Sequence, residues 1–154
     1  MPLVTKRSNP DALRRIEQRQ DELERLVVRV GWSVDMGASP EDVSIVAINA
    51  FGAPSKNIPA RPVLPGFMAS QRSLIRRVSI AATRSAQRGQ DPLPIVQGLS
   101  RALADGLKEA VYAYDEKPNA PSTAKQKGFN DPLIGMGSSG GRIVASANSV
   151  VIRR

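Results

Sequence analysis

The sequence predicts an α+β fold: a small antiparallel sheet of three or more strands, flanked by an N-terminal helix and a central helical hairpin, with long loops. Three observations support this prediction. Apolar residues recur at helical spacing in two regions, β-branched residues form separate short runs, and 12 prolines and 12 glycines gather mostly between them. A chain of 154 residues can bury a core, so we expect one domain spanning 1–154.

An N-terminal helix is expected to begin at Pro10, because Asn9 is a favourable N-cap and proline suits the first helical position. A narrow stripe follows at spacings of three and four: Leu13, Ile16, Gln20, Leu23 and Val27. We expect this stripe to be buried, either against the sheet of the domain or against a second helix. Residues 1–8 are expected to form a flexible arm.

The β-branched runs predict three strands. The first begins near Leu26 and contains Trp32, and the second covers 43–48. Turn residues from Gly37 to Pro40 separate these runs, so we expect a hairpin. The residues of 143–152 predict a third strand that joins it.

The middle of the chain predicts a stiff loop followed by a basic amphipathic helix. Four prolines between Ala50 and Pro65 remove backbone donors and prevent regular structure. Residues 66–88 then place apolar side chains on one side of a helical wheel. The other side carries five arginines: Arg72, Arg76, Arg77, Arg84 and Arg88.

A second central helix completes the expected hairpin. Gly89 ends the basic helix, and Asp91 begins a helix whose apolar residues repeat every four positions as far as Val111. Gly98 and Gly106 weaken this helix by about 1 kcal/mol each relative to alanine, which indicates a closely packed neighbour.

Residues 115–141 form the least regular segment and predict a long loop rich in proline and glycine. Loops of this length are usually disordered or functional. We therefore expect the segment to be mobile in an isolated subunit and ordered in an assembly.

The composition excludes most familiar catalytic chemistry, so we expect no catalytic, cofactor or metal residues and no enzyme activity. The chain has no cysteine and no histidine, which removes disulfides, thiolate nucleophiles, Ser-His-Asp triads and conventional zinc sites. Gly135–Gly140 matches a dinucleotide fingerprint but lacks the flanking strand, helix and later acid. Asp105 and Glu109 lie one helical turn apart beside Lys108, as ordinary solvated charges do.

The positive charge is concentrated in one region. The net charge is +8, and no Asp or Glu lies between Val43 and Gln90, where seven basic residues lie. Such a region favours an anionic partner, either nucleic acid or an acidic protein surface, or it is a solvated face. No aromatic residues are interleaved with the arginines, so only non-specific DNA contact is supported. No apolar run is long enough for a bilayer or a signal peptide, so a soluble protein of the reducing cytoplasm is expected.

Several short motifs, in their order and spacing, resemble the tail-completion family of tailed bacteriophages, which includes the minor tail protein Z type. The likeness runs from about Val30 to the C-terminus. It rests on Phe51-Gly52-Ala53, Ile58-Pro59-Ala60-Arg61-Pro62, a long helix and a second helix, Pro121-Ser122-Thr123, Lys127-Gly128, and Pro132-Leu133-Ile134 with Gly137. Ala50, Ala53 and Val63 depart from the family pattern, as do Pro65-Gly66 and Gly135-Met136.

The resemblance implies an α+β virion subunit that forms a ring, commonly a hexamer, in the phage neck or at the head-proximal end of the tail. Its partners would be copies of itself, the connector or head-closure proteins and the tail tube or terminator. Assembly would take place in the host cytoplasm, without a membrane. A basic nucleic-acid-binding protein is the alternative.

The same resemblance suggests which residues contact neighbours. The candidates are Phe51, Gly52, Pro59, Arg61, Pro62, Pro132, Leu133 and Gly137. Arg61 is expected to bind either a carboxylate on a neighbouring subunit or an acidic residue of its own chain. The arginines of the 66–88 helix are the candidates for contact with DNA or an acidic partner.

Overall fold

The computed structural model describes residues 9–128, 130–131, 133 and 141–154. Its helices are α1 (Pro10–Glu24), α2 (Pro40–Phe51), α3 (Val63–Ser70), α4 (Arg72–Gln87), α5 (Leu93–Tyr112), α6 (Pro121–Lys127) and α7 (Arg142–Ser146). Its strands are β1 (Leu26–Gly31) and β2 (Asn148–Arg153), and short 3-10 turns occupy Val34–Met36 and Pro54–Lys56. The α+β class is therefore confirmed.

The sheet has two strands among the described residues, so the prediction of three or more strands in the sheet is not confirmed. Strands β1 and β2 are antiparallel, with Leu26 opposite Arg153 and Gly31 opposite Asn148. The C-terminal strand predicted over 143–152 is confirmed only in its second half, because Ile143 and Val144 lie in helix α7 and the strand begins at Asn148. It pairs directly with β1 rather than extending a hairpin.

The predicted strand over 43–48 is wrong, because this segment lies inside helix α2. Strong helix-start signals outweigh the β-branched residues. The Asp42 amide donates to Ser39 Oγ at 3.0 Å, Pro40 occupies the first turn, and Glu41 with Asp42 places negative charge at the positive end of the helix dipole.

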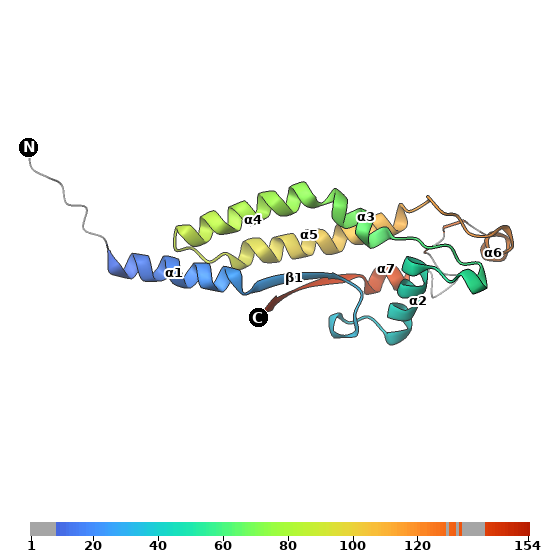
Figure 1. The fold of residues 1–154 in the computed structure, drawn as a ribbon, viewed down its shortest axis with the longest axis horizontal. Coiled ribbons are helices and arrows are strands. Elements are labelled where there is room, and N and C mark those ends of the chain that lie inside the picture. Colours follow the sequence, from blue (N-terminus) through green and yellow to red (C-terminus); the bar gives the residue numbers. More distant parts are fainter. Residues whose placement is uncertain (1–8, 129, 132, 134–140) are drawn as a thin grey trace, which may run out of the picture.

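Helix α5 packs on both strands and forms the centre of the core (Figure 1). Its buried face follows the predicted four-residue repeat, and the core joins residues of α3, α5, α7 and the segments beside them: Phe67, Leu99, Leu103, Leu107, Val111, Leu133, Val144 and Ala147. Ser149 Oγ on β2 donates to the Ser100 carbonyl on α5 at 2.6 Å, which ties the helix to the sheet.

The helical hairpin is confirmed, with one difference. The segment predicted as a single helix over 66–88 consists of α3 and α4, with Gln71 between them. The Leu93 amide donates to Asp91 Oδ1 at 2.9 Å, as expected for the start of α5. A Cβ at Gly106 would lie 3.0 Å from the Phe67 ring, so the predicted close neighbour exists there, whereas Gly98 has open space.

Helix α1 begins as predicted, since Asn9 Oδ1 accepts from the amides of Asp11 and Ala12. Its apolar stripe is not buried as expected. The helix packs against a second helix, α4, which was one of the two expected partners, but none of its residues is fully buried and Leu13 is 51% exposed. Figure 1 shows α1 at one end of the molecule, with α2 and α6 toward the other.

The proline-rich segment is shorter than predicted, because α2 extends to Phe51 and α3 begins at Val63. The expected loop over 115–141 contains helix α6. Residues 1–8, 129, 132 and 134–140 lie outside the described residues, so the predicted N-terminal arm and part of this loop do as well.

Candidate docking site

A partly open apolar groove lies between α2, the end of β1 and the segment that leads into α3. It has a volume of about 630 Å³. One wall is the apolar face of α2, formed by Val43, Val46, Ala47 and Ala50, and the opposite wall includes Trp32, Val63 and Leu64. Val111, Leu133 and Ile143 also line the groove. Four residues suggested by the sequence therefore meet here: Phe51, Arg61, Pro62 and Leu133.

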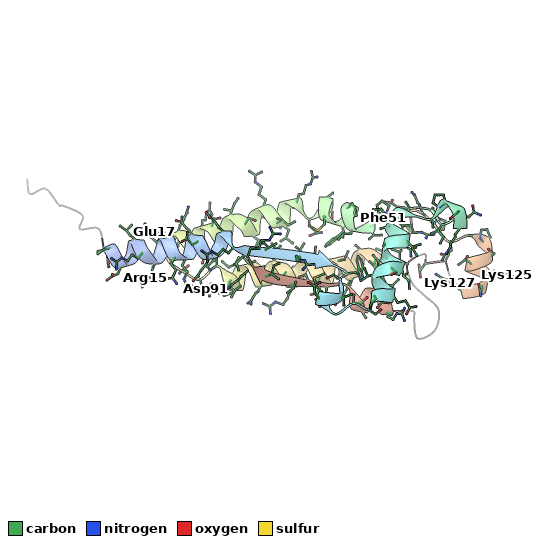
Figure 2. All side chains as sticks on the ribbon, turned by 60° about the horizontal axis from the view of Figure 1, so that its bottom comes forward. Arg15, Glu17, Phe51, Asp91, Lys125 and Lys127 are labelled. Atoms are coloured by element: carbon green, nitrogen blue, oxygen red, sulfur yellow. The ribbon has the colours of Figure 1, made fainter. Side chains whose placement is uncertain are left out.

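Phe51 is the most exposed of the large hydrophobic residues that the structure describes. It ends α2 at the rim of the groove, and its exposed fraction is 83% (Figure 2). Exposure of an apolar aromatic ring to water is unfavourable, and in this position the ring contributes nothing to the core. Exposed apolar residues beside an apolar groove are typical of a surface that binds another protein.

Arg61 is buried, with an exposed fraction of 6%. Its side chain joins segments of the same chain that border the groove. Its Nε donates to the Lys117 carbonyl at 2.9 Å, and its two terminal nitrogens donate to Asn49 Oδ1 at 3.0 Å and the Pro118 carbonyl at 3.2 Å. None of these acceptors is a carboxylate. The expected ion pair with an acidic residue of the same chain is therefore wrong, and the guanidinium is not presented to a neighbour as we expected.

We call the hydrogen bonds around Arg61 the Arg61 clamp, and two further hydrogen bonds to backbone carbonyls complete it. The Arg61 amide donates to the Asn49 carbonyl at 2.7 Å, and Lys117 Nζ donates to the Ala60 carbonyl at 2.8 Å. Burial lowers the pKa of Arg61, and nearby Tyr114 opposes this change. Burial also raises the pKa of Tyr114, as does Glu116 to a smaller extent. The clamp joins α2 to the segments before α3 and after α5.

Gly52 has a structural role that its sequence context did not reveal. Its φ is +76°, and a Cβ there would lie 2.8 Å from the Ala60 nitrogen and 2.9 Å from the Ile58 carbonyl oxygen. Only glycine allows the chain to leave α2 this close to the 58–60 segment. Pro59 lies within that segment and is exposed.

An ion pair fixes the far end of α2. Arg142 on α7 lies 2.6 Å from Asp42 Oδ1 and 3.1 Å from Glu41 Oε2. Burial alone would raise the pKa of Asp42, but the hydrogen bonds from Ser39 and Arg142 and the charge of Arg142 outweigh it and lower that pKa. Both ends of α2 are therefore attached to other segments, and the groove wall is held at two points.

The five arginines suggested for an anionic partner are all exposed; four lie on α4, and the fifth, Arg88, is its C-cap residue. They are Arg72, Arg76, Arg77, Arg84 and Arg88. None of them forms an ion pair with a carboxylate in the described part of the chain. Ile80 lies among them and is 43% exposed.

Two of the suggested contact residues, Pro132 and Gly137, lie outside the described residues, as does the whole glycine-rich 135–140 motif. The sequence missed the α2 wall of the groove. Its signal was the spacing of Val43, Val46, Ala47 and Ala50, which recur at three and four positions as on one face of a helix.

The described residues contain no group of three or more acidic, histidine or cysteine side chains that could hold a metal ion. No helix in the described ranges has the length and apolar character needed to span a membrane. Comparisons with protein-family models, with curated proteins and with solved structures found no match.

Proposed function

We propose that the protein is a structural subunit of a phage neck or tail-completion ring, commonly a hexamer, that joins the tail to the head connector during virion assembly. It acts through contacts with copies of itself and with neighbouring particle proteins, in the virion and without a catalytic centre. The proposal starts from the likeness of its motifs to the tail-completion family.

The observation that carries the proposal is the pairing of the exposed Phe51 with the open apolar groove. A monomer gains nothing from leaving an aromatic ring 83% exposed beside an unfilled apolar surface of this size. A subunit that docks onto another protein gains a buried anchor, and aromatic anchors that fill pockets contribute most of the binding energy in many interfaces.

The way the groove is held supports the same function. Arg61 and Gly52 keep the chain rigid between α2 and α3 through contacts inside the subunit. A surface that is already ordered loses little conformational entropy on docking. We propose that this groove with Phe51 faces a neighbouring neck or tail protein.

Deletion of the coding sequence from a phage that encodes this chain tests the function. We expect filled heads and separate tails in electron micrographs, and restored joining when purified protein is added. Joined particles at the normal yield would contradict the proposal.

A nucleic-acid-binding function is the second candidate, and the unpaired arginines of α4 favour it. Along α4, Arg72 and Arg88 are separated by about 24 Å at 1.5 Å per residue, which suits several phosphates of a duplex. In a ring these arginines would contact the DNA in the channel non-specifically. Binding to duplex DNA that falls steeply with salt would support this function.

Two double charge-reversal variants separate a binding site on α4 from an effect of net charge alone. Arg76→Glu with Arg84→Glu should abolish binding, while Arg14→Glu with Arg15→Glu on α1 changes the net charge equally and should leave most of it. Equal loss in both variants would mean that only net charge matters and would contradict a binding site on α4.

A further inference from the structure

The β1–β2 sheet leaves the outer edge of each strand without a partner. The Arg154 amide donates to the Arg25 carbonyl at 2.9 Å, so residues 25 and 154 are a hydrogen-bonded pair of the antiparallel ladder. Because such pairs alternate, Val27, Arg29 and Gly31 exchange hydrogen bonds with β2. The backbone groups of Leu26, Val28 and Val30 therefore point away from it.

The same alternation directs the backbone groups of Ser149, Val151 and Arg153 away from β1. The Ser149 amide donates to Asn148 Oδ1 at 2.8 Å. Within the described ranges, the other outward backbone groups of both strands have no hydrogen-bond partner. The sheet thus has one open edge on β1 and one on β2.

An apolar groove of about 400 Å³ runs beside β1, between this strand and helix α4. Leu26, Val28 and Val30 line it on the strand side, and α5 contributes Val96, Leu99 and Leu103. Helix α4 lines it with Ile75, Val78, Ser79, Ala82 and Thr83. Figure 2 shows β1 between α4 and β2. Helix α4 therefore lies beside the place where a third strand would pair with β1, and alternate side chains of such a strand would point into this groove.

We propose that the strand that pairs there is β2 of a second copy of this chain. This inference rests on the ring of the proposed function and identifies the contact between its subunits. In a ring whose axis runs along the strands, β1 of one copy and β2 of the next are antiparallel, as they are within a subunit. The contact joins two different edges, so it is heterologous, the type of contact that forms a ring when the rotation between subunits closes.

Charge favours a second copy over another extended segment. The last turn of α1 carries Asp21, Glu22 and Glu24 and no basic residue, although a helix C-terminus favours cations. Arg25, the C-cap residue, is the one cation between this turn and β1. Arg19 pairs with Glu22, but Asp21 and Glu24 have no ion pair in the described part of the chain.

The end of β2 supplies the complementary charge. Arg153 and Arg154 are exposed and likewise form no ion pair with a described residue. Antiparallel pairing brings the end of β2 of one copy to the start of β1 of the next, where α1 ends. The two arginines then lie beside the acidic turn of α1 in the next copy, at the same level as they lie beside Arg25 and Leu26 in their own copy.

Amide hydrogen exchange, read residue by residue in the assembled protein and in the subunit obtained by dilution, tests the contact. The outward amides of Val28 and Val151 should gain protection of about tenfold or more on assembly. The inward amides of Val27 and Ile152 serve as controls on the same strands and should be protected in both states.

Each outcome of the exchange experiment is decisive. An assembly in which the outward amides exchange as fast as in the subunit overturns this inference and leaves the ring standing. A protein that remains monomeric at every concentration overturns the ring of the proposed function and, with it, this contact.

Charge exchange provides a second measurement. Arg153→Glu with Arg154→Glu should raise the midpoint concentration of assembly by about tenfold or more, as should Asp21→Arg with Glu24→Arg. The four substitutions together should restore assembly. If the combined variant assembles weakly although circular dichroism shows an intact fold, the end of β2 does not face the last turn of α1 of the next copy.

Discussion

The side chain of Arg61 binds the backbone of Lys117, and the side chain of Lys117 binds the backbone of Ala60, the residue before Arg61. Arg61 Nε donates to the Lys117 carbonyl at 2.9 Å, and Lys117 Nζ donates to the Ala60 carbonyl at 2.8 Å. The two residues lie 56 positions apart, and their exchange attaches the end of the α5 segment to the chain that enters α3. This contact, together with Asn49 on α2, sets the width of the groove beside Phe51.

Loss of the Arg61 guanidinium should destabilise the protein. Arg61→Met removes the three side-chain hydrogen bonds of Arg61 and leaves their acceptors without this donor. We expect the free energy of unfolding to fall by about 2–4 kcal/mol. Urea unfolding followed by circular dichroism measures it. Arg72→Met, at an exposed position on α4, is the control and should change stability by less than about 0.5 kcal/mol. Equal effects in the two variants would contradict the clamp.

A side chain at Gly52 should be strongly unfavourable. Gly52→Ala places a Cβ within 3 Å of two backbone atoms at a positive φ, and we expect about 1–3 kcal/mol of destabilisation. Gly66→Ala provides the comparison, because Gly66 lies in helix α3 with nothing near its Cβ position. That variant should gain about 0.5–1 kcal/mol. Thermal unfolding of both variants reports the difference, and a neutral Gly52→Ala would mean that this turn relaxes.

Phe51 should matter for docking and not for folding. Phe51→Ala is expected to change the free energy of unfolding by less than about 0.5 kcal/mol, because the ring is 83% exposed. The yield of joined particles in a complementation assay should fall by about tenfold or more, since aromatic anchors carry large shares of binding energy. Ile80→Ala on α4 serves as the matched exposed control and should keep the yield. An unchanged yield with Phe51→Ala would show that Phe51 and the groove beside it do not take part in docking.

Acid should weaken the attachment of α2. Hydrogen bonds and the Arg142 charge, acting against burial, hold the pKa of Asp42 below its ordinary 3.8. A depressed folded-state pKa contributes stability that is present above the unfolded value and is lost as the pH falls through the folded one. We therefore expect the free energy of unfolding to decrease below about pH 4.

Asp42→Asn should flatten this part of the pH profile, whereas Asp105→Asn, at an exposed carboxylate without an ion pair in the described residues, should not. Urea unfolding at several pH values between about 2 and 5 provides the comparison. Identical slopes in the wild type and in Asp42→Asn would show that the Arg142 contact contributes nothing.

Local signals predicted the helices that carry strong caps and unbroken spacing. Asn9 and Pro10 define the start of α1, and Asp91 with the four-residue repeat defines α5. The segment from Val43 to Ile48 was misread because β propensity is a weak prior, and the capping pattern Ser39-Pro40-Glu41-Asp42 decides it. The pairing of β1 with β2 joins residues more than 100 positions apart, and no local pattern specifies that register.

The site was predictable in part. The motifs with Phe51, Arg61, Pro62 and Leu133 indicated residues that share one groove. The direction of Arg61 was not predictable, because an exposed arginine and one that binds carbonyl oxygens inside the chain look the same in a sequence. The role of Gly52 follows only from its φ and the nearness of Ala60.

The central claim is that this chain works by assembling with copies of itself. Native mass spectrometry of the purified protein, over a range of concentrations, tests it most directly. We predict one dominant assembly at a fixed multiple of the 16.5 kDa subunit, in equilibrium with the monomer on dilution. A monomer alone at every concentration, up to about millimolar, would contradict the account.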